Sequence, residues 1–95
     1  MTDATEALIT SWMLALHDKA DSTRELYGDV VRRFAAGLPE GIGLLDATKR
    51  DCQSYFADLR AKGRAQATMR SRWIALRSFY GWAASEDEVV LNPMA

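Results

Sequence analysis

The apolar positions of the chain recur with the spacing of helices, and no stretch keeps the strict alternation of a β-strand. Near the N-terminus Leu8, Trp12 and Leu16 recur every four residues, so they form one apolar stripe on a helix. We therefore predict a first helix over residues 4–18.

A second helix is predicted over residues 23–36. Ser22 suits its N-cap, because a hydroxyl there accepts a hydrogen bond from a free backbone N–H of the first turn. Glu25 follows three residues later, as in a capping box. Gly37 is expected to end the helix in the left-handed conformation. The inward face is expected to comprise Leu26, Tyr27, Val30, Val31 and Phe34.

A glycine-rich loop over residues 37–47 leads to a third predicted helix over residues 49–62. Thr48 is expected to cap this helix together with Asp51, an acidic variant of the capping box, and Gly63 is expected to end it. The loop residues expected to pack on the core are Ile42, Leu44 and Leu45. The inward face of the third helix is expected to comprise Cys52, Tyr55, Phe56 and Leu59.

The fourth predicted helix, over residues 66–85, is the longest. Arg70 and Arg77 are seven residues apart, so they share one face, about a quarter-turn from the apolar stripe. Ala65 stands at the N-cap position and is a poor cap. The apolar stripe is expected to comprise Met69, Trp73, Leu76, Tyr80 and Ala83.

The length and composition favour one globular domain. The chain has 95 residues, and a typical domain holds roughly 100–200. Hydrophobic residues make up 48%, with three Trp, three Tyr and three Phe, which is richer than a disordered chain. Together with the helical periodicity, this predicts an all-α fold, a compact four-helix bundle.

The formal net charge of −1 hides an uneven distribution. Residues 1–59 carry six Lys/Arg against ten Asp/Glu, whereas residues 60–85 carry six Lys/Arg and no acid. The six cations are Arg60, Lys62, Arg64, Arg70, Arg72 and Arg77. A local positive field attracts a partner even when the total charge does not.

Several classes of function find no support in the residues. Cys52 is the single cysteine and His17 the single histidine, without ligands at metal-binding spacing, so we expect no disulfide, metal or cofactor. We find no catalytic Ser-His-Asp arrangement, glycine-rich phosphate loop or carboxylate pair, so the chain itself is not expected to be an enzyme. The acidic start does not look like a signal peptide, and no apolar run approaches the roughly 20 residues of a membrane span. We expect a cytoplasmic protein without a membrane partner.

Three motifs carry a family resemblance. The first is Ser-Thr-Arg-Glu-Leu-Tyr at residues 22–27, which is followed by Val31 and Phe34. The second is the run from Thr68 to Ala83, which contains Leu-Arg-Ser-Phe-Tyr-Gly-Trp. The third is Asn-Pro at residues 92–93. In order and spacing they resemble the N-terminal core-binding domain of tyrosine recombinases, the phage-integrase and Xer-like family. The resemblance extends from about residue 5 to 95.

The resemblance implies a SAM-like bundle over residues 1–88, with 89–95 starting a linker to a catalytic domain that this chain lacks. It implies that the second and fourth helices lie against duplex DNA, as one half of a clamp for recombination and integration. The parent would be a tyrosine-type strand-exchange enzyme, and other protomers would be partners on DNA. The residues implied to contact DNA are Thr23, Arg24 and Tyr27 on the second helix and Arg70, Ser71, Ile74 and Arg77 on the fourth.

The residues themselves lead to a similar interpretation and leave alternatives open. Lys62 and Arg64, in the turn before the fourth helix, are placed for phosphate contacts. Ile74 suits an apolar contact with a thymine methyl group. Each of these features also has a structural interpretation. The basic run is what a solvated helix face looks like. Thr23 suits a supplementary cap beside Ser22, and Tyr27 suits the hydrophobic core. A helical protein–protein interaction module is the alternative function, favoured by the acidic first half and the apolar tail.

Overall fold

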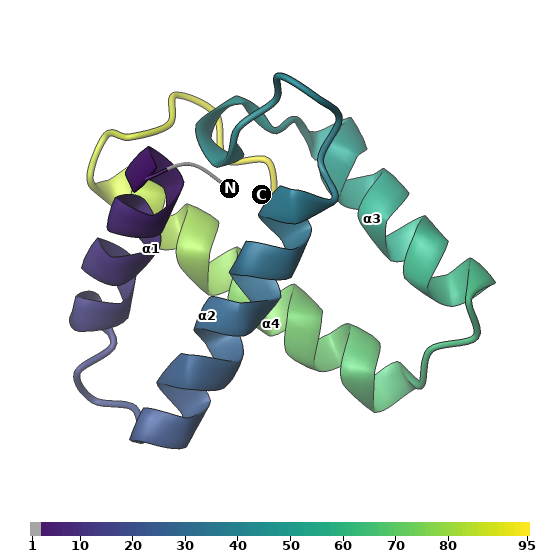
Figure 1. Ribbon diagram of the computed structural model, residues 1–95, viewed down its shortest axis with the longest axis horizontal. Coiled ribbons are helices and arrows are strands. Elements are labelled where there is room, and N and C mark those ends of the chain that lie inside the picture. The colour runs from purple at the N-terminus through teal and green to yellow at the C-terminus, as the bar shows by residue number, and fades with distance from the viewer. Residues whose placement is uncertain (1–2) are drawn as a thin grey trace.

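The computed structural model describes residues 3–95, and within that range the regular structure is helical. The helices are α1 (Asp3–Ala15), α2 (Asp21–Ala36), α3 (Lys49–Ala61) and α4 (Gln66–Ser85), and a short 3-10 turn occupies Leu44–Asp46. In Figure 1, α4 runs behind α2 and spans the molecule from the end of α3 to α1. The predicted all-α, four-helix fold is confirmed.

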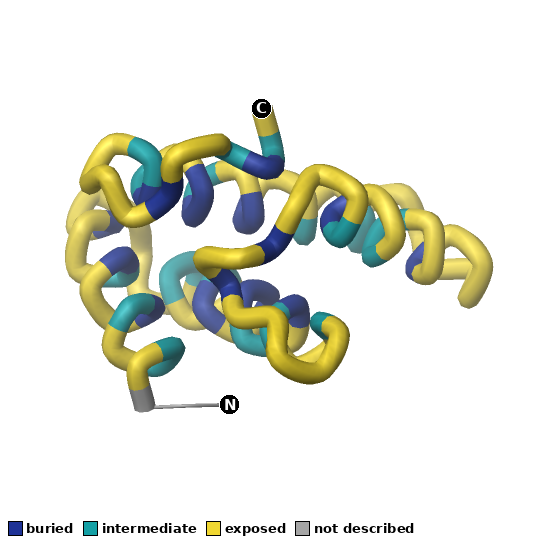
Figure 2. The backbone as a smooth tube through the Cα atoms, turned by 90° about the horizontal axis from the view of Figure 1, so that it is seen from above, coloured by how far each residue is buried: buried dark blue, intermediate teal, exposed yellow. Residues whose placement is uncertain are grey.

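A chain of aromatic rings runs through the core and joins all four helices. Trp12 of α1 meets Phe79 of α4 edge-on at 5.4 Å between ring centroids, and Phe79 meets Tyr80 at 4.9 Å. Tyr80 contacts Phe34 of α2 at 6.3 Å, and Phe34 meets Tyr55 of α3 at 5.1 Å. Edge-to-face pairs add about 0.5–1.5 kcal/mol each beyond the burial of their surface. Figure 2 shows the buried segments turned inward between the helices.

The ends of α3 form as the sequence predicts, because both depend on neighbouring residues alone. The Thr48 hydroxyl accepts from the Asp51 backbone N–H at 3.2 Å, and the Asp51 carboxylate accepts from the Thr48 N–H at 2.8 Å. Gly63 follows the helix with a φ of +72°. The Arg64 N–H then donates to the carbonyl of Leu59, which closes a Schellman motif.

The ends of α1 and α2 differ from the prediction. The first helix ends at Ala15, not near residue 18. Helix α2 begins at Asp21 after Ala20, so Ser22 lies inside the first turn and does not form the predicted box with Glu25. An acid at the first helical position stabilises the positive end of the helix. Gly37 is not left-handed: its φ is −88°, and its N–H donates to two carbonyls of the last turn.

Several predicted core residues are exposed instead. Trp73 retains 42% of its surface exposed and Leu26 52%, while Ala75 and Phe79 are fully buried. The buried arc of α4 is rotated away from α3, because α4 packs mainly against α2 and only thinly against α3. Of the three loop residues predicted to pack on the core, only Leu44 is buried, whereas Ile42 and Leu45 are 37% and 40% exposed. Ala47, at the end of the loop, is buried as well.

The segment after α4 folds back against the domain. Val89 and Pro93 are buried and Met94 packs against the core cluster, whereas Val90 and Leu91 are exposed. The Asn92 side chain accepts from the Met94 N–H at 2.8 Å, which fixes this turn. The domain boundary after residue 88 and the linker at 89–95 stay predictions.

Candidate nucleic-acid interface

The outer side of α4, which we define by Arg70, Ile74 and Arg77, carries the two arginines that helical spacing places on one face. Arg70, Ile74 and Arg77 follow each other at intervals of four and three residues, and all three are exposed. The guanidinium of Arg77 lies 5.0 Å from the ring centroid of Trp73. A cation–π contact at such a site contributes about 0.5–1 kcal/mol and holds the side chain in a defined direction.

Three cations of this surface, Arg64, Arg70 and Arg77, have no carboxylate partner within residues 3–95. The ion pairs in that range join Arg24 to Asp21, Arg32 to both Glu6 and Asp29, and Lys62 to Asp58. Arg64, Arg70 and Arg77 are in none of them. Arg72 of α4 instead donates to the Tyr55 hydroxyl at 2.8 Å and so joins α4 to α3. The positive field of the basic run is therefore largely uncompensated.

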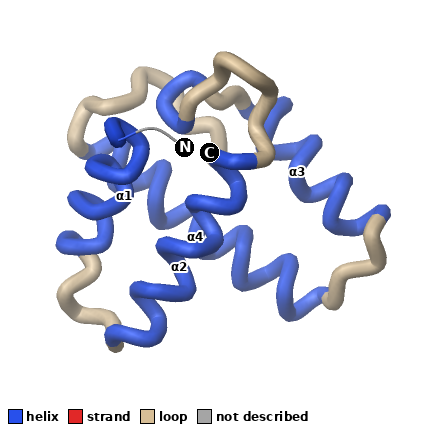
Figure 3. The backbone as a smooth tube through the Cα atoms, viewed as in Figure 1, coloured by secondary structure: helices blue, strands red, loops and turns tan. Residues whose placement is uncertain are grey.

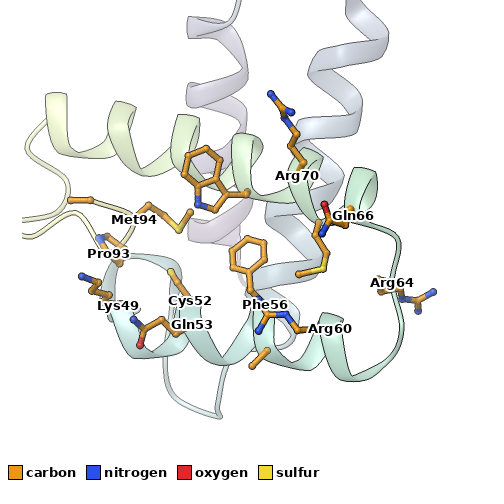
Figure 4. Close-up of a pocket in the computed structure, with 14 residues that line it drawn as sticks. Lys49, Cys52, Gln53, Phe56, Arg60, Arg64, Gln66, Arg70, Pro93 and Met94 are labelled. Carbon is orange, nitrogen blue, oxygen red and sulfur yellow. The ribbon is translucent and has the colours of Figure 1, made fainter.

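An open groove of about 800 Å³ runs between α3, α4 and the C-terminal segment. Figure 4 shows Lys49, Cys52, Phe56 and Arg60 rising from α3, with Met94 at one end of the groove and Arg64 at the other. The lining residues include no Asp or Glu. The groove therefore combines an apolar floor with a cationic edge.

Of the three α2 residues predicted to contact DNA, Arg24 and Tyr27 have partners within the molecule, and Thr23 is half-buried. Thr23 and Tyr27 are half-buried, and the Tyr27 ring stacks nearly parallel to Trp12 at 6.4 Å. Arg24 forms an ion pair with Asp21. A separate hollow between α2 and α4 is lined by Ser71, so Ser71 faces the α2 side of α4 while Arg70 lines the groove on the α3 side. The predicted contacts thus divide between two sides of α4.

The N-termini of α2 and α4 have a feature in common. Ala20 and Ala65 occupy their N-cap positions, and neither helix start has a side-chain cap. In Figure 3 the turn before α2 lies at the lower left of the molecule and the turn before α4 at the lower right. Free N–H groups at a helix start favour anions such as phosphate. The first turn of α4 has no acid, whereas that of α2 contains Asp21.

The titratable groups of the core offer no reactive site. Burial, reinforced by the negative charge of Asp51, raises the pKa of the Cys52 thiol to about 11, so the thiol is protonated at neutral pH. Burial also raises the pKa of the Tyr80 phenol above its ordinary range, and this hydroxyl donates to the carbonyl of Leu44 at 2.8 Å. Within residues 3–95, no cluster of His, Cys, Asp or Glu is arranged to hold a metal ion. No helix of this part of the chain is both long and apolar enough to cross a membrane.

Sequence patterns missed part of this surface. Arg60 belongs to the acid-free run, yet its place beside α4 depends on the packing of α3. Lys49 stands outside that run and gives no sequence signal at all. Trp73 was assigned to the core, although its spacing from Arg77 is that of neighbours on one face.

Comparison with known proteins gives a family but no individual relative. No curated protein and no solved structure matches the chain. The family described as "Phage integrase, N-terminal SAM-like domain" matches residues 9–87, which include all of α2, α3 and α4. The chain therefore belongs to the phage integrase family, of which it contains the N-terminal SAM-like domain.

Proposed function

We propose that this domain binds double-stranded DNA, using the outer side of α4 and the N-terminal ends of α2 and α4. The observation that carries the proposal is the exposure of Arg70 and Arg77 on one side of α4, without a carboxylate partner in residues 3–95. The domain itself is non-catalytic, so its contribution to an integrase-family protein is binding.

The dimensions of α4 support this role. Seven residues of helix rise about 10 Å, and the major groove of B-DNA is about 12 Å wide. Arg70 and Arg77 therefore reach phosphates or guanine edges on a single duplex, because arginine offers a planar fork of donors. Ile74, between them, suits a thymine methyl group. On the side toward α2, Ser71 is a hydrogen-bond donor to phosphate or base.

Phosphate contacts at the helix starts position the domain. The free N–H groups at the start of α4 receive one phosphate, and Lys62 and Arg64 in the preceding turn add charge. Lys62 gives up its exposed pair with Asp58 to do so, at a cost of about 0–1 kcal/mol. At the start of α2, Arg24 similarly gives up its ion pair with Asp21 and binds a phosphate instead.

Thr23 and Tyr27 flank that position on α2. Because the starts of α2 and α4 both lie in the lower part of Figure 1, at its left and right, the domain would contact one face of the duplex. We extend the proposal to a parent that performs tyrosine-type DNA strand exchange in recombination or integration. Its catalytic domain would complete a clamp around the duplex, and other protomers on the same DNA would be partners in the cytoplasm.

Fluorescence anisotropy with duplex DNA at low salt tests the proposal. We expect binding of residues 1–95 whose log K falls linearly with log salt, by about 0.9 per phosphate contact. The double variant Arg70→Ala and Arg77→Ala should lower that slope by about 1.8 if both contact phosphate. Lys49→Ala with Arg50→Ala is the matched control, since it removes two exposed cations at the start of α3, outside the proposed DNA contacts.

Two results would overturn the proposal. One is an absence of DNA binding at low salt by residues 1–95 and by a longer protein that contains them. The other is an equal loss of affinity in the α4 variant and in the control, which would mean that only total charge matters. Circular dichroism on each variant excludes unfolding as the cause.

A further inference from the structure

We propose that the groove between α3, α4 and the C-terminal segment is a docking site for an acidic amphipathic helix of a protein partner. This inference does not rest on DNA binding. It follows from the combination of an apolar floor with unpaired cations in one open groove.

The floor is apolar surface that the domain leaves in contact with solvent. Trp73 is 42% exposed, and Phe56 and Met94 are half-buried. Phe56 is also held in place, because it meets Tyr55 edge-on at 5.4 Å at the end of the aromatic chain. Rigid aromatic surface beside a flexible methionine is typical of the pockets that receive anchor residues of a partner.

Four cations line the groove. Lys49 and Arg60 lie on α3, Arg64 in the turn and Arg70 on α4. None of these four is in an ion pair within residues 3–95, and the lining residues include no Asp or Glu. Lys49 and Arg60 are eleven residues apart, so they share a face about 16 Å apart along the helix. A partner with acids on its flanks would match this pattern.

A helix fits both features better than a duplex does. DNA presents phosphates to the cations, but a phosphate backbone leaves the Phe56 and Met94 side chains without an apolar partner. A helix with apolar residues at i, i+4 and i+7 and acids beside them covers the floor and neutralises the edge together. A groove of about 800 Å³ is large enough for a few side chains of such a helix, which itself lies across the top.

The test uses a synthetic amphipathic peptide of about four helical turns, with Leu at i, i+4 and i+7 and Glu on both flanks. Binding is measured by fluorescence anisotropy and by the NMR signal of the Trp73 indole N–H. We expect saturable binding that moves this signal and leaves the buried Trp12 indole unchanged. A peptide of the same composition in scrambled order, and one with Lys in place of Glu, should bind much more weakly.

Charge reversal locates the site. Lys49→Glu with Arg60→Glu should weaken peptide binding by roughly tenfold, since two exposed attractions become repulsions. Lys19→Glu with Arg50→Glu changes the net charge equally, away from the groove, and should leave the affinity within about twofold. All four residues are exposed, so the folds should persist.

The outcomes separate the possible occupants. Absence of peptide binding, equal weakening in the two charge-reversal variants, or an unmoved Trp73 signal would overturn the proposal. Self-association that Lys49→Glu with Arg60→Glu abolishes would assign the groove to a second copy instead. If the peptide does not bind and Lys49→Glu with Arg60→Glu weakens the binding of duplex DNA more than Lys19→Glu with Arg50→Glu does, the groove belongs to nucleic acid. DNA binding through Arg77, outside the lining of the groove, is measured separately, so either proposal can fail alone.

Discussion

Replacing each of two tryptophans by alanine should separate a core ring from a surface ring. Trp12 is fully buried, meets Phe79 edge-on and stacks on Tyr27, and its indole N–H points to the Ser78 hydroxyl at 3.4 Å. Removing such a ring loses transfer energy and leaves a cavity, so Trp12→Ala should lower the free energy of unfolding by about 3–5 kcal/mol. That is a large part of a small domain's stability of about 5–15 kcal/mol.

Replacing Trp73 by alanine should lower the free energy of unfolding by less than Trp12→Ala does. It is 42% exposed and lies at the open groove. Slightly more than half of its surface is covered, which is about 100 Å² for a ring that buries 150–250 Å² in full. At about 25 cal/mol per Å² this area contributes about 2.5 kcal/mol, and the lost contact with Arg77 adds about 0.5–1 kcal/mol. Trp73→Ala should therefore cost about 3 kcal/mol, at the low end of the range for Trp12→Ala. No closed cavity forms, because water fills the space.

Urea denaturation followed by circular dichroism at the helix band measures both losses without relying on tryptophan fluorescence. The slope of free energy against urea should stay constant in both variants, since a changed slope would indicate altered denatured states. Equal losses for Trp73→Ala and Trp12→Ala would show that Trp73 is packed in the core, and that α3 covers α4 more fully than the structure has it.

Three further predictions concern single groups. Tyr80→Phe removes the donor to the Leu44 carbonyl and leaves that buried acceptor unpaired, so thermal melting should show a loss of about 1–3 kcal/mol; an unchanged melting temperature would mean that water replaces the bond. Because the pKa of Cys52 is raised from 9.0 to about 11, its contribution to stability is complete below pH 9 and is lost as pH rises through 11. Urea titrations between these pH values should show the fall, and Cys52→Ala should make it smaller, while the part due to Tyr80, whose pKa is also raised, remains. Ala65→Ser adds a cap at a residue that already has extended backbone angles, and should stabilise the domain by about 0.5–1 kcal/mol in the same assay, whereas no gain would mean that the hydroxyl does not reach the helix start.

Local rules predicted those features that neighbouring residues determine. The capping box at Thr48 and the end of the helix at Gly63 each need only a few adjacent residues, and both formed as expected. The start of α2 was wrong because Asp21 and Ser22 both favour a helix start, and the sequence offered no ground for choosing between them.

Packing between helices was the part that periodicity left open. Helical spacing allows two buried faces on α4, one through Trp73 and Leu76 and the other through Leu76 and Phe79. The choice between them depends on which neighbouring helix α4 packs against, and the structure has the second. The same limit applies to the candidate surface. Arg70 and Arg77 share a side of α4 by periodicity alone, but the cations of α3 join them only because α3 lies beside α4.

The contrast between helix starts connects stability with the proposed DNA role. Helix α3 has a complete capping box, whereas α4 begins after Ala65 and gives up about 1 kcal/mol that a polar residue there would supply. A polar cap occupies the same N–H groups that our proposal assigns to a phosphate. Ala65→Ser should therefore raise stability and lower DNA affinity together, the opposing changes expected where a functional site forgoes a stabilising residue. A variant that gained stability without losing affinity would place the phosphate elsewhere on α4.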